Sequence, residues 1–158
     1  MLIDITIEYD AWSQLDGLEN LIKTAARAAV FEREDEFKNR AELSILLTSD
    51  DAIRQLNSTY RGQDRPTNVL SFGGEPEARS SDQGFLLGDI VLSYQTINTE
   101  AEQQQKNFGN HVSHLIVHGV LHLLGYDHRD DETADAMELV EINILKGIGI
   151  ENPYSQIH

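Results

Sequence analysis

Five of the six histidines of this chain lie within one segment of eighteen residues, HVSHLIVHGVLHLLGYDH (111–128). On a helix, His118 and His122 share one face one turn apart, which is the spacing that two imidazoles need to bind one metal ion. Gly125 tolerates a left-handed conformation after the helix, so the chain can double back and bring His128 within reach. The segment therefore predicts a metal site formed by His118, His122 and His128.

Three histidine ligands leave a coordination position for water, as in catalytic rather than structural zinc sites. Neutral imidazole also suits copper, nickel or iron, so spacing alone does not select the metal. His111 is two turns from His118, about 10 Å by helical rise, and His114 points less directly toward the side of the helix that His118 and His122 share. Both are therefore expected on the surface or hydrogen-bonded to a metal-binding side chain. Asp127 either orients a ligand or is an ordinary turn residue.

The residue that follows the first predicted metal ligand indicates which class of reaction the site could catalyse. Zinc proteases commonly carry a glutamate there as general base, whereas this chain has Gly119. Attack on phosphorus is compatible with that absence, because positioning and charge stabilisation do most of the work in phosphoryl chemistry. Such a site benefits from a guanidinium, which can grip two phosphate oxygens. Arg61 and Arg65 in YRGQDRPTNVLSF (60–72) are candidates, and their spacing does not choose between them.

Hydrophobic periodicity supplies the elements that must position these residues. Alternating apolar residues and turn signals predict four strands, at 3–8, 43–47, 68–72 and 87–92. Helical spacing predicts helices at 18–29, after the capping residues Thr48 and Ser49, near 97–107, at 111–124 and at about 131–146. This order predicts an α+β fold in a single domain, a small four-stranded mixed sheet that is mostly parallel with one antiparallel strand, packed with about five helices. The domain is expected to cover 1–150, with 151–158 as a short C-terminal tail.

Composition narrows the class of protein. The 158 residues include no cysteine, which excludes disulfides and thiol chemistry. The chain has 12 Lys and Arg against 27 Asp and Glu, a net charge of −15, which argues against a generic nucleic-acid coat and against DNA as a partner. No window of 18 continuous apolar residues is present, so no membrane span is expected. The start, MLIDITIEYD, lacks the pattern of a secretory signal, and a cytoplasmic location is expected.

Several segments together resemble one known family. HGVLHLLGYDH (118–128), YRGQDRPTNVLSF (60–72), LGDIVLS (87–93) and MELVEINIL (137–145) are similar to the YbeY family of bacterial endoribonucleases, over about residues 43 to 149. The chain departs from the family at Gly73-Gly74, where the family often has a proline, which leaves the shape of the adjoining loop open.

The resemblance implies a single α+β domain that binds one zinc ion per chain through His118, His122 and His128. It implies hydrolysis of single-stranded RNA, maturation of ribosomal RNA, notably the 3′ end of the small-subunit RNA, and ribosome quality control in the cytoplasm. It also implies that Arg61 is important for activity. The acidity of the chain suggests that the ribosome or a ribosomal protein delivers the RNA. Two alternatives are a zinc hydrolase of another substrate class, such as peptides, and a non-catalytic ribosome-assembly factor with a structural metal.

Overall fold

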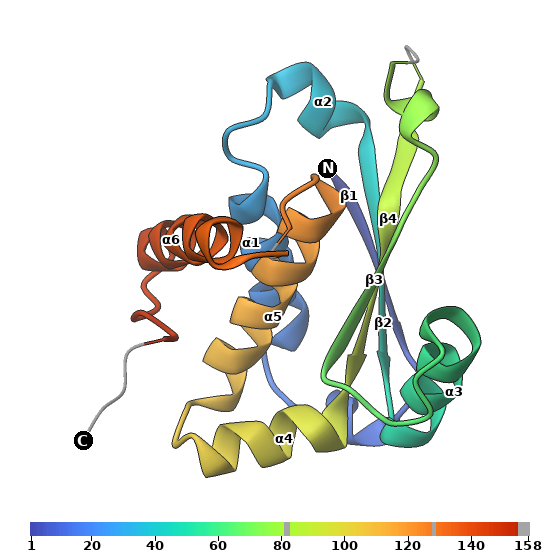
Figure 1. Cartoon of the computed structure of the whole chain (residues 1–158), viewed down its shortest axis with the longest axis vertical. Helices are drawn as coiled ribbons and strands as arrows, with labels where there is room; N and C mark the ends of the chain where they lie inside the picture. The colour runs from blue at the N-terminus through green and yellow to red at the C-terminus, as the bar shows by residue number, and fades with distance from the viewer. Residues whose placement is uncertain (81–82, 128, 155–158) are drawn as a thin grey trace.

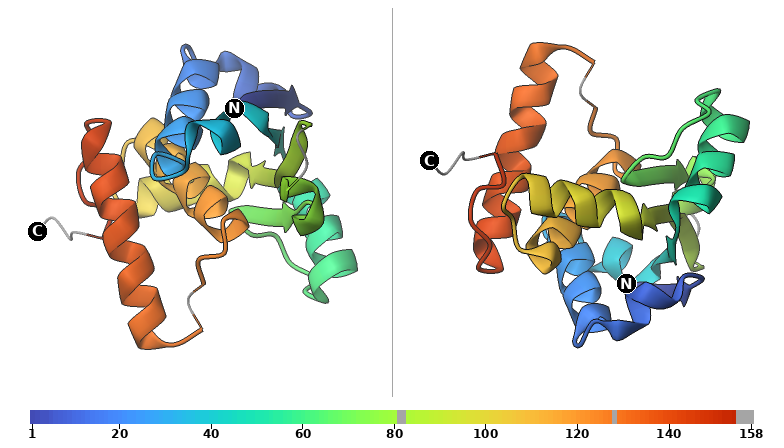
Figure 2. Two further views of the ribbon diagram at one scale, coloured as in Figure 1. Left: turned by 90° about the horizontal axis from the view of Figure 1, so that it is seen from above. Right: turned by 90° about the horizontal axis from the view of Figure 1, so that it is seen from below.

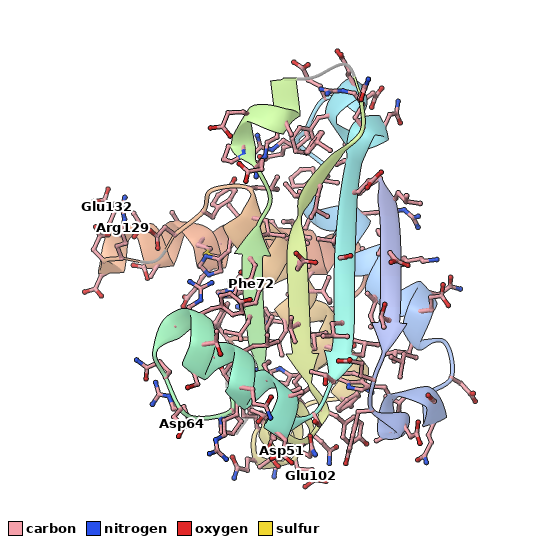
Figure 3. All side chains as sticks on the ribbon, turned by 90° about the vertical axis from the view of Figure 1, so that its right-hand side faces the viewer. Asp51, Asp64, Phe72, Glu102, Arg129 and Glu132 are labelled. Atoms are coloured by element: carbon pink, nitrogen blue, oxygen red, sulfur yellow. The ribbon has the colours of Figure 1, made fainter. Side chains whose placement is uncertain are left out.

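The computed structural model of the chain describes residues 1–80, 83–127 and 129–154. Its single sheet contains β1 (Leu2–Ile7), β2 (Ala41–Thr48), β3 (Val69–Gly73) and β4 (Phe85–Ser93). The strand order is β1-β2-β4-β3; β1, β2 and β4 run parallel, and β3 is antiparallel to β4 (Figure 3). The predicted α+β fold with a mostly parallel mixed sheet is therefore confirmed.

The helices form layers on the two faces of this sheet. Among the described residues they are α1 (Leu18–Ala29), α2 (Asp35–Arg40), α3 (Asp50–Arg61), α4 (Tyr94–Gln103), α5 (Phe108–Leu123) and α6 (Asp131–Gly147), with short 3₁₀ turns η1 (Asp10–Gln14) and η2 (Pro76–Ser80). Helix α3 covers one face of the sheet, while α1 and α5 lie on the other (Figure 1). Helix α6 lies outside α5, further from the sheet (Figure 2). No helix of the described part of the chain is long and apolar enough to cross a membrane.

The structure changes the predicted elements in two places. Helix α2 was not predicted, because none of its six residues is buried and it therefore carries no apolar periodicity. Helix α4 begins at Tyr94, directly after β4, and not near 97. At this start, the Tyr94 ring packs edge-on against the fully buried Trp12, with 5.4 Å between ring centroids. The predicted boundary between a domain at 1–150 and a tail at 151–158 stays a prediction, and residues 155–158 lie outside the described residues.

Two glycines let the chain approach itself closely near the end of α5. A Cβ added at Gly88 of β4 would lie 2.5 Å from the backbone oxygen of Phe72 and 2.6 Å from Cδ2 of Leu123. A Cβ at Gly74 would lie 2.0 Å from the backbone oxygen of Leu86, and the Gly74 N–H donates to the carbonyl of Leu87 at 3.0 Å. The glycine pair at 73–74 thus extends the pairing of β3 with β4, and a proline at position 74 would lack the donor.

We predict that Gly88→Ala destabilises the protein by about 1–3 kcal/mol, because the new methyl group must displace either the β3 backbone or Leu123. The free energy of unfolding from urea denaturation measures the effect. Gly73→Ala is the matched control, since Gly73 is the register partner of Gly88 and has no atom within 4 Å of an added Cβ. Equal stabilities of the two variants would contradict the prediction.

Candidate metal centre

Helix α5 carries the histidines and is buried on almost every side. It packs against α1, α4, α6, β3 and β4, and eleven of its sixteen residues are buried. Asn107 caps its start by accepting a hydrogen bond from the N–H of Asn110 at 3.1 Å. His118 and His122 are exceptions on this helix, since both are only partly buried. An apolar helix thus carries two adjacent imidazoles at a position that solvent can reach.

The end of α5 is built as the sequence predicts, by a glycine turn. Gly125 has a φ of 104°, and its N–H donates to the His122 carbonyl at 3.0 Å while the Tyr126 N–H donates to the Leu121 carbonyl at 3.0 Å. These two bonds form a Schellman motif. The turn brings the Tyr126 carbonyl back to the His122 ring, which donates from Nδ1 to that oxygen at 3.1 Å. The helix ending therefore fixes the orientation of His122.

The ring of His118 is fixed by a carboxylate that the sequence analysis missed. Nδ1 of His118 lies 2.5 Å from Oε1 of Glu141, a residue of α6 with no exposed surface. An ionised carboxylate can only accept, so Nδ1 of His118 carries the proton and Nε2 carries a lone pair. A signal for Glu141 exists in the sequence, because it occupies a position of the apolar stripe Met137, Glu141, Ile144 and Leu145 on α6.

The two Nε2 atoms of His118 and His122 lie 3.0 Å apart. Since each ring donates from Nδ1, the Nε2 atoms of the two neutral rings direct lone pairs to the same point, an arrangement that a shared cation satisfies. Two imidazole nitrogens bound tetrahedrally to one zinc ion at about 2.0–2.1 Å are about 3.3 Å apart. Anchoring of Nδ1 by a carboxylate or a carbonyl is also the usual support of metal-binding histidines. The chemistry of this donor pair therefore fits a metal ion.

Glu141 is the centre of a hydrogen-bond network. The hydroxyl of Tyr154 donates to Oε2 of Glu141, and Nε2 of His114 lies 3.1 Å from that hydroxyl. Burial alone would raise the pKa of Glu141, but the hydrogen bonds from His114, His118 and Tyr154 outweigh it and lower this pKa to about 2. Burial, and then the neighbouring Glu141, raise the pKa of Tyr154. Glu141 is thus ionised and Tyr154 protonated at neutral pH.

The other histidines differ from the expectation of a surface position. His111 and His114 are 5% and 8% exposed, so neither lies on the surface. The alternative expectation was a role in supporting a metal-binding side chain. His114 is connected to the predicted ligand His118 in this way, through the Tyr154 hydroxyl and Glu141. His111 lies 2.9 Å from the Glu100 carboxylate and joins α5 to α4. The sequence missed this burial because it could not show that α6 and the C-terminal segment cover this part of α5.

The third predicted ligand, His128, lies outside the described residues, so its place in the site stays a prediction. Within residues 1–80, 83–127 and 129–154, no three His, Asp, Glu or Cys side chains gather into a group that could hold a metal. Asp127 forms an ion pair with Arg129, with 3.0 Å between Oδ2 and Nε. Its alternative role of orienting a ligand stays a prediction.

The predicted catalytic arginine is held against an edge strand. The glycine-capped end of α3 places Arg61 beside β3, where its Nη2 donates to the Ser71 carbonyl at 2.7 Å. Its guanidinium carbon lies 5.2 Å from the centroid of the Phe72 ring, which Figure 3 shows on β3 next to α3. Arg61 and Arg65 are both exposed. The contacts with Ser71 and Phe72 nevertheless give the Arg61 guanidinium a defined position.

Two arginines that the sequence analysis did not select meet the end of α5. Nη2 of Arg79 donates to the Leu123 carbonyl at 2.9 Å, and Nη2 of Arg33 donates to the Leu124 carbonyl at 3.3 Å. They satisfy carbonyls that a helix end leaves without partners and complement its dipole. Positive charge consequently lies directly after His122 in the fold, although the whole chain carries −15.

Comparison with known proteins gives a consistent match. A family model described as Endoribonuclease YbeY matches residues 6–149. A protein named Endoribonuclease YbeY from Rhodopseudomonas palustris (strain HaA2) is 46% identical over 96% of this chain and 80% of its own length. Another of that name from Azorhizobium caulinodans is 44% identical over 98% of this chain and 97% of its own length. The solution structure of TM1509 from Thermotoga maritima has a TM-score of 0.62 and 28% identity, over 93% of this chain and 89% of that one.

We predict that Glu141→Ala lowers the free energy of unfolding by about 2–4 kcal/mol, because His118 and Tyr154 lose the charged, fully buried acceptor that they share. Chemical denaturation of the metal-free protein measures this loss. Asp135→Ala is the control, since Asp135 is an exposed acid of the same helix, and its effect should stay within about 0.5 kcal/mol. A Glu141 variant as stable as the Asp135 variant would show that the network contributes nothing.

Proposed function

Because the chain belongs to the YbeY endoribonuclease family, we propose that it is a zinc-dependent endoribonuclease that cuts single-stranded ribosomal RNA. In this proposal it matures the 3′ end of the small-subunit RNA and takes part in ribosome quality control in the cytoplasm. The metal is held by His118, His122 and His128. The family supports the nuclease activity, and the paired imidazoles of His118 and His122 support the metal.

The observation that carries the proposal is the pair of Nε2 atoms of His118 and His122, 3.0 Å apart, with each ring anchored through Nδ1. When bound, a zinc ion supplies Lewis acidity both to a phosphodiester and to the attacking water. Glu141 and the Tyr126 carbonyl hold the two rings in the tautomer that leaves Nε2 able to bind. A buried carboxylate and the motif that ends α5 therefore fix the orientation of these two imidazoles.

The phosphate side of the reaction is supported by fixed positive charges. Arg61 is held on β3 by Ser71 and Phe72, so its guanidinium need not be ordered when charge builds up on the phosphate. Arg33 and Arg79 contact the end of α5 directly after His122. In a chain of net charge −15, these cations offset the repulsion of a polyanion near the site.

A peptide hydrolase is the less favoured alternative. A Cβ at Gly119 would lie 3.0 Å from Cδ1 of Ile90 in β4, so a side chain at this position would be directed at the sheet. A glutamate could not serve there as general base without pushing α5 away from β4. The other alternative, a ribosome-assembly factor whose metal only braces the fold, predicts that ribosome binding survives in folded variants that lack the metal.

We predict that His122→Ala abolishes both metal content and RNA cleavage, because it removes one of the proposed metal ligands. The measurements are metal content by mass spectrometry and cleavage of a labelled single-stranded RNA that spans the 3′ end of the small-subunit RNA. A duplex of the same sequence and a peptide panel test the substrate class. Asp135→Ala serves as the control. Cleavage by metal-free wild type would refute the mechanism.

Arg61→Ala is expected to reduce the cleavage rate by about 10²-fold or more, the usual effect of removing one donor that stabilises transition-state charge. Metal content should not change, because the contacts that fix Arg61 are with Ser71 and Phe72 of β3 and not with His118 or His122. Arg65→Ala is the matched control, an arginine of the same turn for which the family implies no role. Similar rates for both variants would remove Arg61 from the proposed site.

A further inference from the structure

The C-terminal segment reaches back to the metal centre through one side chain. After α6 ends, Gly149 has a φ of 82° and the Ile150 N–H donates to the Leu145 carbonyl at 2.9 Å, which turns the chain back along the helix. The Tyr154 N–H donates to Oδ1 of Asn152 at 2.8 Å. These bonds give the segment a defined path, although it contains no helix or strand.

Tyr154 contacts both α5 and α6. Its hydroxyl donates to Oε2 of Glu141 and accepts from Nε2 of His114 at 3.1 Å. Its ring packs edge-on against the His114 ring, with 5.1 Å between centroids and an interplanar angle of 83°. Tyr154 is still 39% exposed, so burial of its apolar surface contributes little to this contact. The hydrogen bonds of its hydroxyl account for the contact better.

The two oxygens of Glu141 have different partners. Oε1 accepts from His118 at 2.5 Å, and Oε2 accepts from Tyr154. Nε2 of His114 is 3.6 Å from Oε2, a longer and weaker contact than that of the Tyr154 hydroxyl. Without the Tyr154 hydroxyl, Oε2 would keep only this longer contact, and the plane of the carboxylate would be less firmly fixed. Rotation would disturb the bond to Nδ1 of His118.

The space beside this network makes such a rearrangement easy. A cavity of about 630 Å³ lies between the α4–α5 connection and the C-terminal segment, and Lys106, His111, His114 and Tyr154 are among the residues that line it. The packing around Tyr154 is therefore incomplete on one side. The hydrogen bonds of the hydroxyl and the ring contact with His114 therefore hold Tyr154 at the wall of this cavity.

We propose that Tyr154 is a positioning residue for His118: its hydroxyl fixes the plane of Glu141, which in turn holds His118 in the tautomer and orientation that bind metal. The C-terminal segment thereby completes the metal centre of the domain. The functional consequence rests on the zinc-dependent activity proposed above, whereas the hydrogen-bond chain itself can be tested without metal.

Tyr154→Phe removes only the hydroxyl and keeps the ring. In the metal-free protein, nitrogen NMR of the imidazoles should show His118 as a single Nδ1-protonated tautomer in wild type and as a mixture in Tyr154→Phe. Zinc affinity, measured by competition with a chelator, should fall about tenfold, the lower end of the effect of groups that orient metal ligands. Tyr9→Phe is the matched control, since Tyr9 lies against Tyr94 and loses the same hydroxyl elsewhere in the fold.

The outcomes separate the two proposals. A wild type that binds no zinc would overturn the proposed function, while the tautomer measurement would still decide the role of Tyr154. Unchanged tautomer and unchanged zinc affinity in Tyr154→Phe would overturn the positioning role, even if the melting temperature falls. A lower melting temperature with a mixed tautomer and weaker zinc binding would support it.

Discussion

The burial of the Glu141 carboxylate is the constraint on which the geometry of the two predicted metal ligands, His118 and His122, depends. A carboxylate with no exposed surface is tolerated only when donors surround it, because its ionised form loses the hydration of water. Here the donors come from His118 of α5 and from Tyr154 of the C-terminal segment. One charge therefore ties together α5, α6 and the end of the chain, and it selects the proton position on a predicted metal ligand.

The second constraint is the close approach of α5 to the sheet. Gly119 lies against the Ile90 side chain, and Gly88 lies against the Leu123 side chain, so at each of these points one side chain fills the space between the helix and β4. This packing buries most of α5 and leaves His118 and His122 as partly exposed polar positions. The same packing explains why residue 119 cannot supply a general base, which favours chemistry that relies on a metal and on fixed cations.

The net charge of the chain does not show that several arginines lie at defined positions near the end of α5 and on β3. The chain as a whole would repel a polyanion. Yet Arg33 and Arg79 bind carbonyls at the end of α5, and Arg61 is fixed against β3. Cations held by the backbone cost little further ordering when they meet a phosphate, which makes a locally favourable site compatible with an acidic protein.

The sequence by itself determined the elements with strong periodicity and the position of the glycine turn. Alternation in β1 and β2, the apolar run of α5 and the left-handed Gly125 could be predicted because they depend on local backbone preferences and on the side that faces the core. The choice of His118 and His122 followed from the same local geometry, since residues four apart on a helix share a face. Helix α2 escaped prediction because none of its residues is fully buried, and Phe37 alone is too little for a periodic apolar pattern.

Only the tertiary structure decided what surrounds these residues. Glu141 and Tyr154 are 23 and 36 residues after His118 in the chain, and no local pattern states that a glutamate within an apolar stripe will meet an imidazole of another helix. The burial of His111 and His114 and the contacts of Arg79 with α5 have the same origin. Pairing between distant segments is set by how whole elements pack, because the stabilising hydrogen bonds exist only after the surfaces that exclude water have come together.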